Sequence, residues 1–248
     1  MPTKDLSVQG GKPDALGLAG KVKLHNDAFL AVFNDKYRDR GIGVTAGAGN
    51  KWVGVNGKKE WMIEGFEQRA LRAMIIRELI LTAEAFLNPT PFMDRVLKHL
   101  GYRRYQDVIE RRFFGGARPF VQPLTKAQRV REFRLPEWFG RELARGSRGA
   151  QRMAHEYGRH VAGGVVALIR KLGLKRLEFD VILSGSVLAN LKPVRTAAAE
   201  TIKKAAPRAR VSGAKFRPVR GALLYAAHAA WGSIDGRRAF SDRRLSYG

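Results

Sequence analysis

The chain has 248 residues, of which 45% are hydrophobic, so it is long enough and apolar enough to bury a substantial core. It has no cysteine and only five scattered histidines, which excludes disulfides and thiolate metal sites, and we predict no metal-ligating residues. Lys and Arg total 46 and Asp and Glu total 22, which gives a net charge of +24. This charge predicts attraction to polyanions such as nucleic acid. No motif that would read a base sequence accompanies it.

The sequence also lacks features of a membrane protein. No apolar run approaches the roughly 18–20 residues that a membrane-spanning helix needs. Residues 1–20 have no apolar centre of the kind found in signal peptides. We therefore expect a cytoplasmic protein with no membrane partner.

The first elements expected are a short strand around residues 22–24 and a short helix over residues 28–33, joined by His25-Asn26-Asp27. Asp27 has two interpretations. It is either the N-cap of the helix, which is common, or a carboxylate placed to take a proton from a substrate hydroxyl.

A pair of hairpins is expected next. Residues 41–46 and 51–55 read as strands joined by the turn Gly47-Ala48-Gly49-Asn50, and Asn56-Gly57 is a strong signal for a second turn before a strand over residues 59–63. A turn without bulky side chains lets backbone N–H groups approach an anion. The plain alternative is that this segment is only a turn.

The middle of the chain has helical periodicity. Residues 66–87 predict a helix that Pro89 and Pro91 terminate, and shorter helices are expected over residues 92–100, 105–113 and 136–144. A second long helix is expected over residues 149–172, with a soft break at Gly163-Gly164.

Strands and helices alternate towards the C-terminus, which favours an α/β sheet with parallel pairings. We expect strands over residues 177–183 and 209–214, and helices over residues 191–206 and 222–231. The turn Ser184-Gly185-Ser186 follows the first of these strands, where α/β folds bind ligands. Pro218 and Gly221 precede the last helix, whose small residues suit close packing.

Four segments, in order, resemble the BadF/BadG/BcrA/BcrD ATPase family, which includes N-acetylglucosamine kinase and belongs to the actin, Hsp70 and hexokinase superfold. They are LHNDA at 24–28, GIGVTAGAGN at 41–50, VILSGSV at 181–187 and PVRGAL at 218–223. The resemblance covers roughly residues 20–232. It implies an α/β, actin-like ATPase (ribonuclease H-like) lobe: a mixed sheet with flanking helices and a helical insertion.

The resemblance also implies a domain division and a set of site residues. Residues 1–38 would be a remnant of a first lobe, residues 39–235 a nucleotide-binding second lobe, and residues 236–248 a basic tail. Asp27 would be the catalytic base. The cofactors would be ATP and Mg²⁺, and the expected substrate is an amino sugar. The expected nucleotide contacts are Gly47, Ala48, Gly49 and Asn50 at the phosphates, Gly185 and Ser186 near the nucleoside, and Gly221 in the closing helix.

The sequence departs from the family pattern at three places. It has no DGGGT phosphate hairpin, Ala48 and Asn50 replace two hydroxyl residues of the family's GTGS turn, and Ile63 stands where an acidic residue would precede Glu64. We therefore expect a truncated or degenerate nucleotide-binding protein, with a partner chain or a second copy completing the cleft. The alternative function is a non-catalytic basic scaffold that binds nucleic acid or another polyanion.

Overall fold

The computed structural model describes residues 27–33, 38–47, 49–65, 70–113, 124–216 and 218–231. Its centre is a five-stranded mixed sheet with the strand order β3-β2-β1-β4-β5. The strands are β1 (Arg40–Ala46), β2 (Asn50–Asn56), β3 (Lys59–Gly65), β4 (Phe179–Ser184) and β5 (Ala209–Gly213).

The sheet combines two hairpins with two parallel pairings. β1 and β2 pair antiparallel, as do β2 and β3, and the Asn56-Gly57 turn joins the second pair as expected. β4 adds parallel to β1, and β5 adds parallel to β4. Because the carboxyl ends of β1, β4 and β5 meet at one edge, the segments that follow these strands lie near one another.

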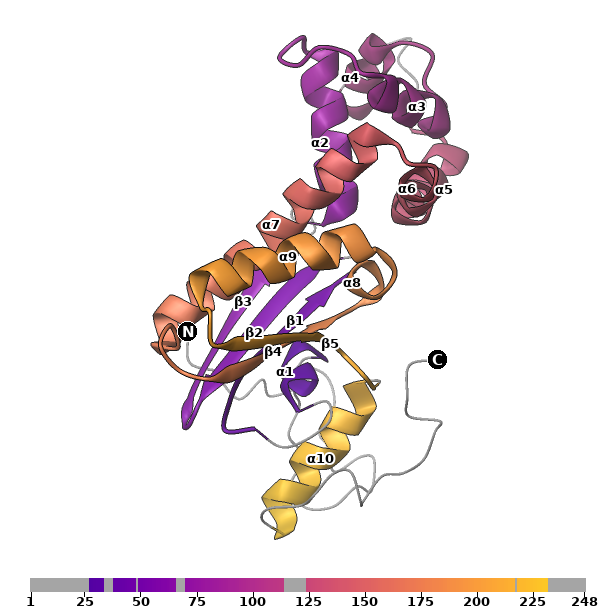
Figure 1. Cartoon of the computed structure of the whole chain (residues 1–248). Coiled ribbons are helices and arrows are strands. Elements are labelled where there is room, and N and C mark those ends of the chain that lie inside the picture. Colours follow the sequence, from indigo (N-terminus) through magenta and orange to yellow (C-terminus); the bar gives the residue numbers. More distant parts are fainter. Residues whose placement is uncertain are drawn as a thin grey trace, which may run out of the picture.

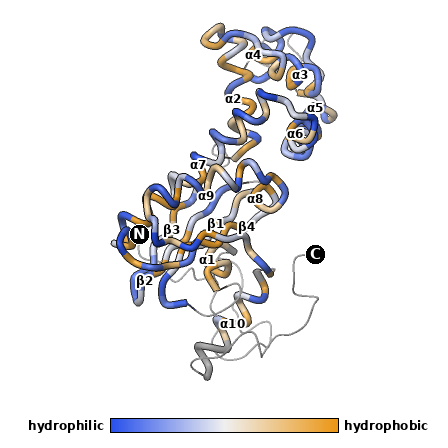
Figure 2. The backbone as a smooth tube through the Cα atoms, viewed as in Figure 1, coloured by the Kyte–Doolittle hydropathy of each residue, from blue (hydrophilic) through white to orange (hydrophobic). Residues whose placement is uncertain are grey.

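Helices cover both faces of the sheet (Figure 1). α7 (Arg148–Leu172) and α9 (Lys192–Ala205) pack along each other on one face, and α1 (Asp27–Val32) and α10 (Pro218–Trp231) lie on the other. Figure 2 shows hydrophobic colour along β1 and β4 and alternating colours along α7 and α9. This pattern is the one expected of buried parallel strands flanked by amphipathic helices.

The remaining helices form a separate helical module that sits beyond the sheet at one end of α7 (Figure 1). They are α2 (Leu71–Ala83), α3 (Pro91–Leu100), α4 (Tyr105–Phe113), α5 (Lys126–Phe133) and α6 (Leu135–Ala144). The short α8 (Ser186–Asn190) follows β4. At 25 residues, α7 is about 37 Å long and contributes to the core of both halves.

The predicted hairpins, the strands near the C-terminus and most helices are confirmed, with differences that have physical causes. The first long helix ends at Ala83, because Ala85 adopts a positive φ of 61°, and Pro91 begins α3 instead of ending α2. Helix α5 was not predicted. α10 begins at Pro218, four residues earlier than expected.

The predicted break at Gly163-Gly164 is wrong, because α7 is continuous there. Gly164 instead allows the Trp52 ring to pack on the helix, since a Cβ at this position would lie 2.5 Å from the ring. The expected strand at 22–24 and the tail at 236–248 lie outside the described residues. No helix in the described part of the chain is long and apolar enough to cross a membrane.

Candidate functional site

The carboxyl ends of β1 and β4 are joined through two hydroxyl groups. The Ser184 hydroxyl donates to the Val44 carbonyl at 2.7 Å, and it lies 2.9 Å from Thr45 Oγ1. Since the single proton of Ser184 is used by Val44, the Thr45 hydroxyl is the donor in the second bond. These two side chains therefore fix the strand ends that carry the two glycine turns.

The turn between β4 and α8 requires glycine at its centre. Gly185 has a φ of +91°, and a Cβ there would lie 2.3 Å from the Ala46 carbonyl oxygen. This turn therefore rests directly on the end of β1. Ser186 follows as the first residue of α8.

The turn between β1 and β2 meets the β4–α8 turn. The Gly47 N–H donates to the Gly49 carbonyl at 3.0 Å, and a Cβ at Gly47 would lie 3.5 Å from Ser186 Oγ. Ala48 lies outside the described residues. Neither Gly47 nor Gly49 is required by packing, because an added Cβ would make only ordinary contacts at both positions. The space beside Gly47 opens towards Ser186, whereas Gly49 faces the Gly65 carbonyl and does not line the cleft described below.

Asn50 differs from the other turn residues because its side chain faces the interior. It is fully buried, and its Oδ1 accepts a hydrogen bond from the Tyr157 hydroxyl at 2.8 Å. Burial raises the pKa of Tyr157 to about 12, so this hydroxyl stays protonated and remains the donor. Asn50 therefore ties the turn to α7, and it does not line the cleft described below.

The predicted base and the third glycine lie on the α1 side of the sheet. α1 runs against β1 with Ala28 over Gly43 and Val32 over Gly41, so Asp27 stands at the carboxyl end of β1, although its side chain is outside the described part. Gly221 packs α10 on α1, because a Cβ there would lie 2.0 Å from the Leu30 carbonyl oxygen. The structure thus brings Gly47 and Ser186 together but uses Gly221 for helix packing.

Gly47 and Ser186 line a cleft of about 890 Å³ between the sheet and the helical module. One wall is formed by the turns and by the α8–α9 junction, and the other by α6, where Gly140 approaches Leu191. Its remaining lining residues are Arg72, Phe133, Pro136, Glu137, Arg141, Leu143, Ala144, Val187, Asn190, Lys192 and Pro193.

The wall of this cleft that the helical module forms was not predicted from the sequence. Arg72 and Arg141 from the helical module and Lys192 from the α8–α9 junction bring three cations to the cleft against one carboxylate, Glu137, while Phe133 and its apolar neighbours supply flat surface. The helix that carries Arg141 was predicted over residues 136–144. Nothing in its local pattern indicated that it would face the two glycine turns.

Comparison with solved structures identifies the fold. The chain is similar to a putative N-acetylglucosamine kinase from Chromobacterium violaceum, with a TM-score of 0.55, 15% identity, and coverage of 82% of this chain and 65% of that protein. It also matches a putative N-acetylglucosamine kinase from Porphyromonas gingivalis, with a TM-score of 0.45, 15% identity, and coverage of 82% and 64%. A further match is a ROK family glucokinase from Streptomyces griseus, solved with glucose and AMPPNP, with a TM-score of 0.45, 18% identity, and coverage of 87% and 69%.

The similarity to the Chromobacterium violaceum protein, together with the sheet topology, shows that the chain has an α/β, actin-like ATPase fold. The chain spans slightly less than two thirds of the length of the two N-acetylglucosamine kinase-like proteins. The sequence matches no established family profile, and no curated protein is significantly similar to it.

Proposed function

We propose that the chain binds ATP in the cleft between α6 and the two glycine turns, as the nucleotide-binding part of a sugar-kinase-like phosphotransferase or ATPase. The observation that carries this proposal is the meeting of Gly47 and Ser186, which lie 139 residues apart in the sequence, in one cleft. Because of the four sequence segments described above, the proposal includes a relationship to the BadF-type ATPases.

The residues of the cleft suit a nucleoside triphosphate. A volume of about 890 Å³ is within the usual range of roughly 300–1,000 Å³ for small-molecule sites. Phe133, Leu143 and Val187 offer apolar surface to a base, and Arg72, Arg141 and Lys192 offer positive charge to the phosphates. Since the Gly47 N–H already donates to the Gly49 carbonyl, these cations are the main source of attraction for the phosphates, and Mg²⁺ would accompany the nucleotide.

The full activity would require a second lobe, from a longer form of this chain, a second copy or a partner protein. With that lobe in place, the proposed reaction is phosphorylation of an amino sugar. The sugar hydroxyl attacks the terminal phosphorus, its proton passes to the Asp27 carboxylate, and ADP leaves. Without a sugar, water would be the attacking group and the reaction would be ATP hydrolysis.

Calorimetric titration with ATP and Mg²⁺ tests the binding proposal. We expect saturable heat below about 1 mM ATP, and its absence at that concentration would remove the proposal. A Gly47→Val variant places two methyl groups beside Ser186 and is expected to weaken binding at least tenfold.

Gly213→Val is the matched control for this variant. Gly213 is also at the end of a sheet strand, a Cβ there would have no atom within 4 Å, and the residue does not line the cleft. We expect its ATP affinity to stay within about twofold of the wild type. Equal losses in both variants would show that strand distortion, and not the cleft, is responsible.

A further inference from the structure

A cluster of cations lies at the edge of the sheet opposite the cleft, and we call it the basic edge. It follows the C-terminal ends of α7 and α9 and the connections from these helices to β4 and β5. Its six exposed side chains are those of Lys171, Lys175, Arg176, Lys203, Lys204 and Arg208.

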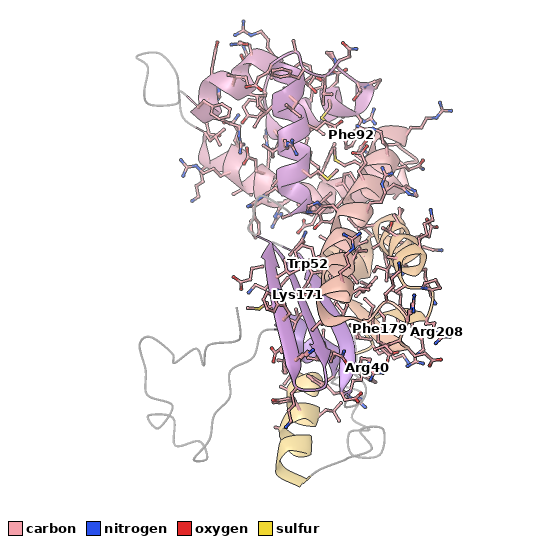
Figure 3. All side chains as sticks on the ribbon, turned by 90° about the vertical axis from the view of Figure 1, so that its left-hand side faces the viewer. Arg40, Trp52, Phe92, Lys171, Phe179 and Arg208 are labelled. Atoms are coloured by element: carbon pink, nitrogen blue, oxygen red, sulfur yellow. The ribbon has the colours of Figure 1, made fainter. Side chains whose placement is uncertain are left out.

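A hydrogen bond joins the two helix–strand connections of the basic edge. Arg208 Nη1 donates to the Arg176 carbonyl at 3.2 Å, and Lys203 Nζ donates to the Pro207 carbonyl at 3.3 Å. Lys171 lies over the Trp61 ring at 4.2 Å. Figure 3 shows Lys171 and Arg208 in the sheet-bearing half of the molecule, away from Phe92 in the helical module.

The positive charge of the basic edge is not neutralised by the carboxylates around it. Within the described part of the chain, none of its six cations forms an ion pair with a carboxylate. Of the acidic residues beside it, Glu178 and Asp180 are both bound by Arg210. In the same described part, Glu200, one helical turn before Lys203 and Lys204 in α9, forms no ion pair with either lysine. In the helical module, by contrast, several arginines are paired, as Arg104 is with Asp107.

Helix stabilisation explains only half of this cluster. Lys171, Lys203 and Lys204 lie in the last turns of α7 and α9, where cations interact favourably with the helix dipole. Lys175, Arg176 and Arg208 lie in the connections and have no such role. Their presence beside the helix ends points to a polyanionic ligand.

We propose that the basic edge binds the phosphodiester backbone of nucleic acid. Exposed lysine and arginine side chains recognise the charge of the backbone and not the sequence of bases. Lys203 of this edge and Lys192 in the cleft are 11 residues apart in α9, which is about 17 Å along the helix. Nucleic acid and ATP therefore bind at separate places, and this inference does not depend on the proposed ATP site.

The test compares two charge-reversal variants that each lower the net charge by six. K203E/K204E/R208E alters the basic edge, and K98E/K126E/R129E alters exposed cations of the helical module. Binding of a fluorescent 20-base-pair DNA duplex and the equivalent RNA duplex is measured by anisotropy over a range of KCl concentrations. At about 0.1 M salt, we expect the edge variant to lose at least about 20-fold in affinity and the control less than threefold.

The salt dependence identifies the ligand groups. Each lost phosphate contact reduces the slope of log affinity against log salt by about 0.9, so we expect a slope shallower by about two to three for the edge variant alone. Binding to either duplex supports the proposal, and saturating ATP should leave it unchanged. The proposal would be overturned by equal losses of affinity in both variants or by no binding of the wild type to either duplex. Tighter binding of a heparin fragment of equal charge would also overturn it. K203Q/K204Q/R208Q replaces the edge variant if charge reversal prevents folding.

Discussion

Two adjacent glycines of α7 provide a direct test of how the long helix is held on the sheet. Gly163 is exposed and a Cβ there would have no atom within 4 Å, whereas a Cβ at Gly164 would lie 2.5–2.7 Å from three atoms of the Trp52 ring. Exchange of glycine for alanine inside a helix normally stabilises it by about 1 kcal/mol. The two positions should therefore respond with opposite signs.

The cost at Gly164 follows from the immobility of the indole ring. Trp52 is buried, its Nε1 donates to the Val161 carbonyl at 2.8 Å, and its other edge lies against Gly65, where a Cβ would be 2.8 Å away. Displacing the ring costs about 1–3 kcal/mol in strain and about 1 kcal/mol for the hydrogen bond. After the helix gain is subtracted, Gly164→Ala should be destabilising by about 1–3 kcal/mol.

Urea unfolding of both variants, followed by circular dichroism, measures the difference. We expect Gly163→Ala to raise the free energy of unfolding by about 0.5–1 kcal/mol, so the two variants should differ by roughly 1.5–4 kcal/mol. Adding Trp52→Phe to Gly164→Ala should cost less than the sum of the single effects, because the smaller ring relieves the clash. Equal stabilisation by both alanine substitutions would refute this account of the Trp52 contact.

Three further predictions concern other parts of the molecule. Asp180→Asn should destabilise the protein by about 3–5 kcal/mol at pH 7, because it removes the carboxylate that binds the buried Arg38. Burial alone would raise the pKa of Asp180, but hydrogen bonds from Arg38 and Arg210 outweigh this effect, so the pKa is lowered. The ionised carboxylate therefore stabilises the fold at pH values above its unfolded pKa. In a pH series of urea midpoints, the difference in stability between Asp180→Asn and the wild type should shrink as the pH falls below about 4. Thr125→Ala should cost about 1 kcal/mol by removing the capping box with Gln128, whereas Thr201→Ala inside α9 should stay within about 0.5 kcal/mol by the same measurement. In any preparation that turns over ATP, Asp27→Asn should lower the rate of ADP release by about 10²–10⁴-fold with unchanged ATP affinity, and an unchanged rate would exclude Asp27 as the base.

The sequence predicted the sheet well because its strands are bounded by strong local signals. Asn56-Gly57 forces a tight turn, and Gly185 provides the positive φ that the β4–α8 turn requires. Helix α5 was missed although Thr125 and Gln128 form a capping box three residues apart, a signal that would have found it. The prediction of a break at Gly163-Gly164 was wrong because it relied on the low helix propensity of glycine. Gly164 is needed for the close approach of the Trp52 ring, which is distant in sequence.

The candidate site was predictable only on the side formed by the turns. Gly47 and Ser186 stand at strand ends, and parallel pairing of those strands suffices to bring them together. Arg72 and Arg141 reach the cleft through the packing of the helical module, which no local pattern encodes. Asn50 was placed in the correct turn, but its buried bond to Tyr157 depends on the position of α7.

The continuity of α7 has a consequence for the cleft, because both of its walls depend on this helix. Near its beginning, Arg152 forms an ion pair with Glu78 of α2 and so connects α7 to the helical module that carries α6. In its middle, Tyr157 holds Asn50 at the base of the β1–β2 turn. An unbroken helix between these contacts fixes the distance between the helical module and the base of the β1–β2 turn. Ligand-driven closure would then have to occur at the α2–α6 contacts or at the β1–β2 turn, since α7 has no break at which to bend.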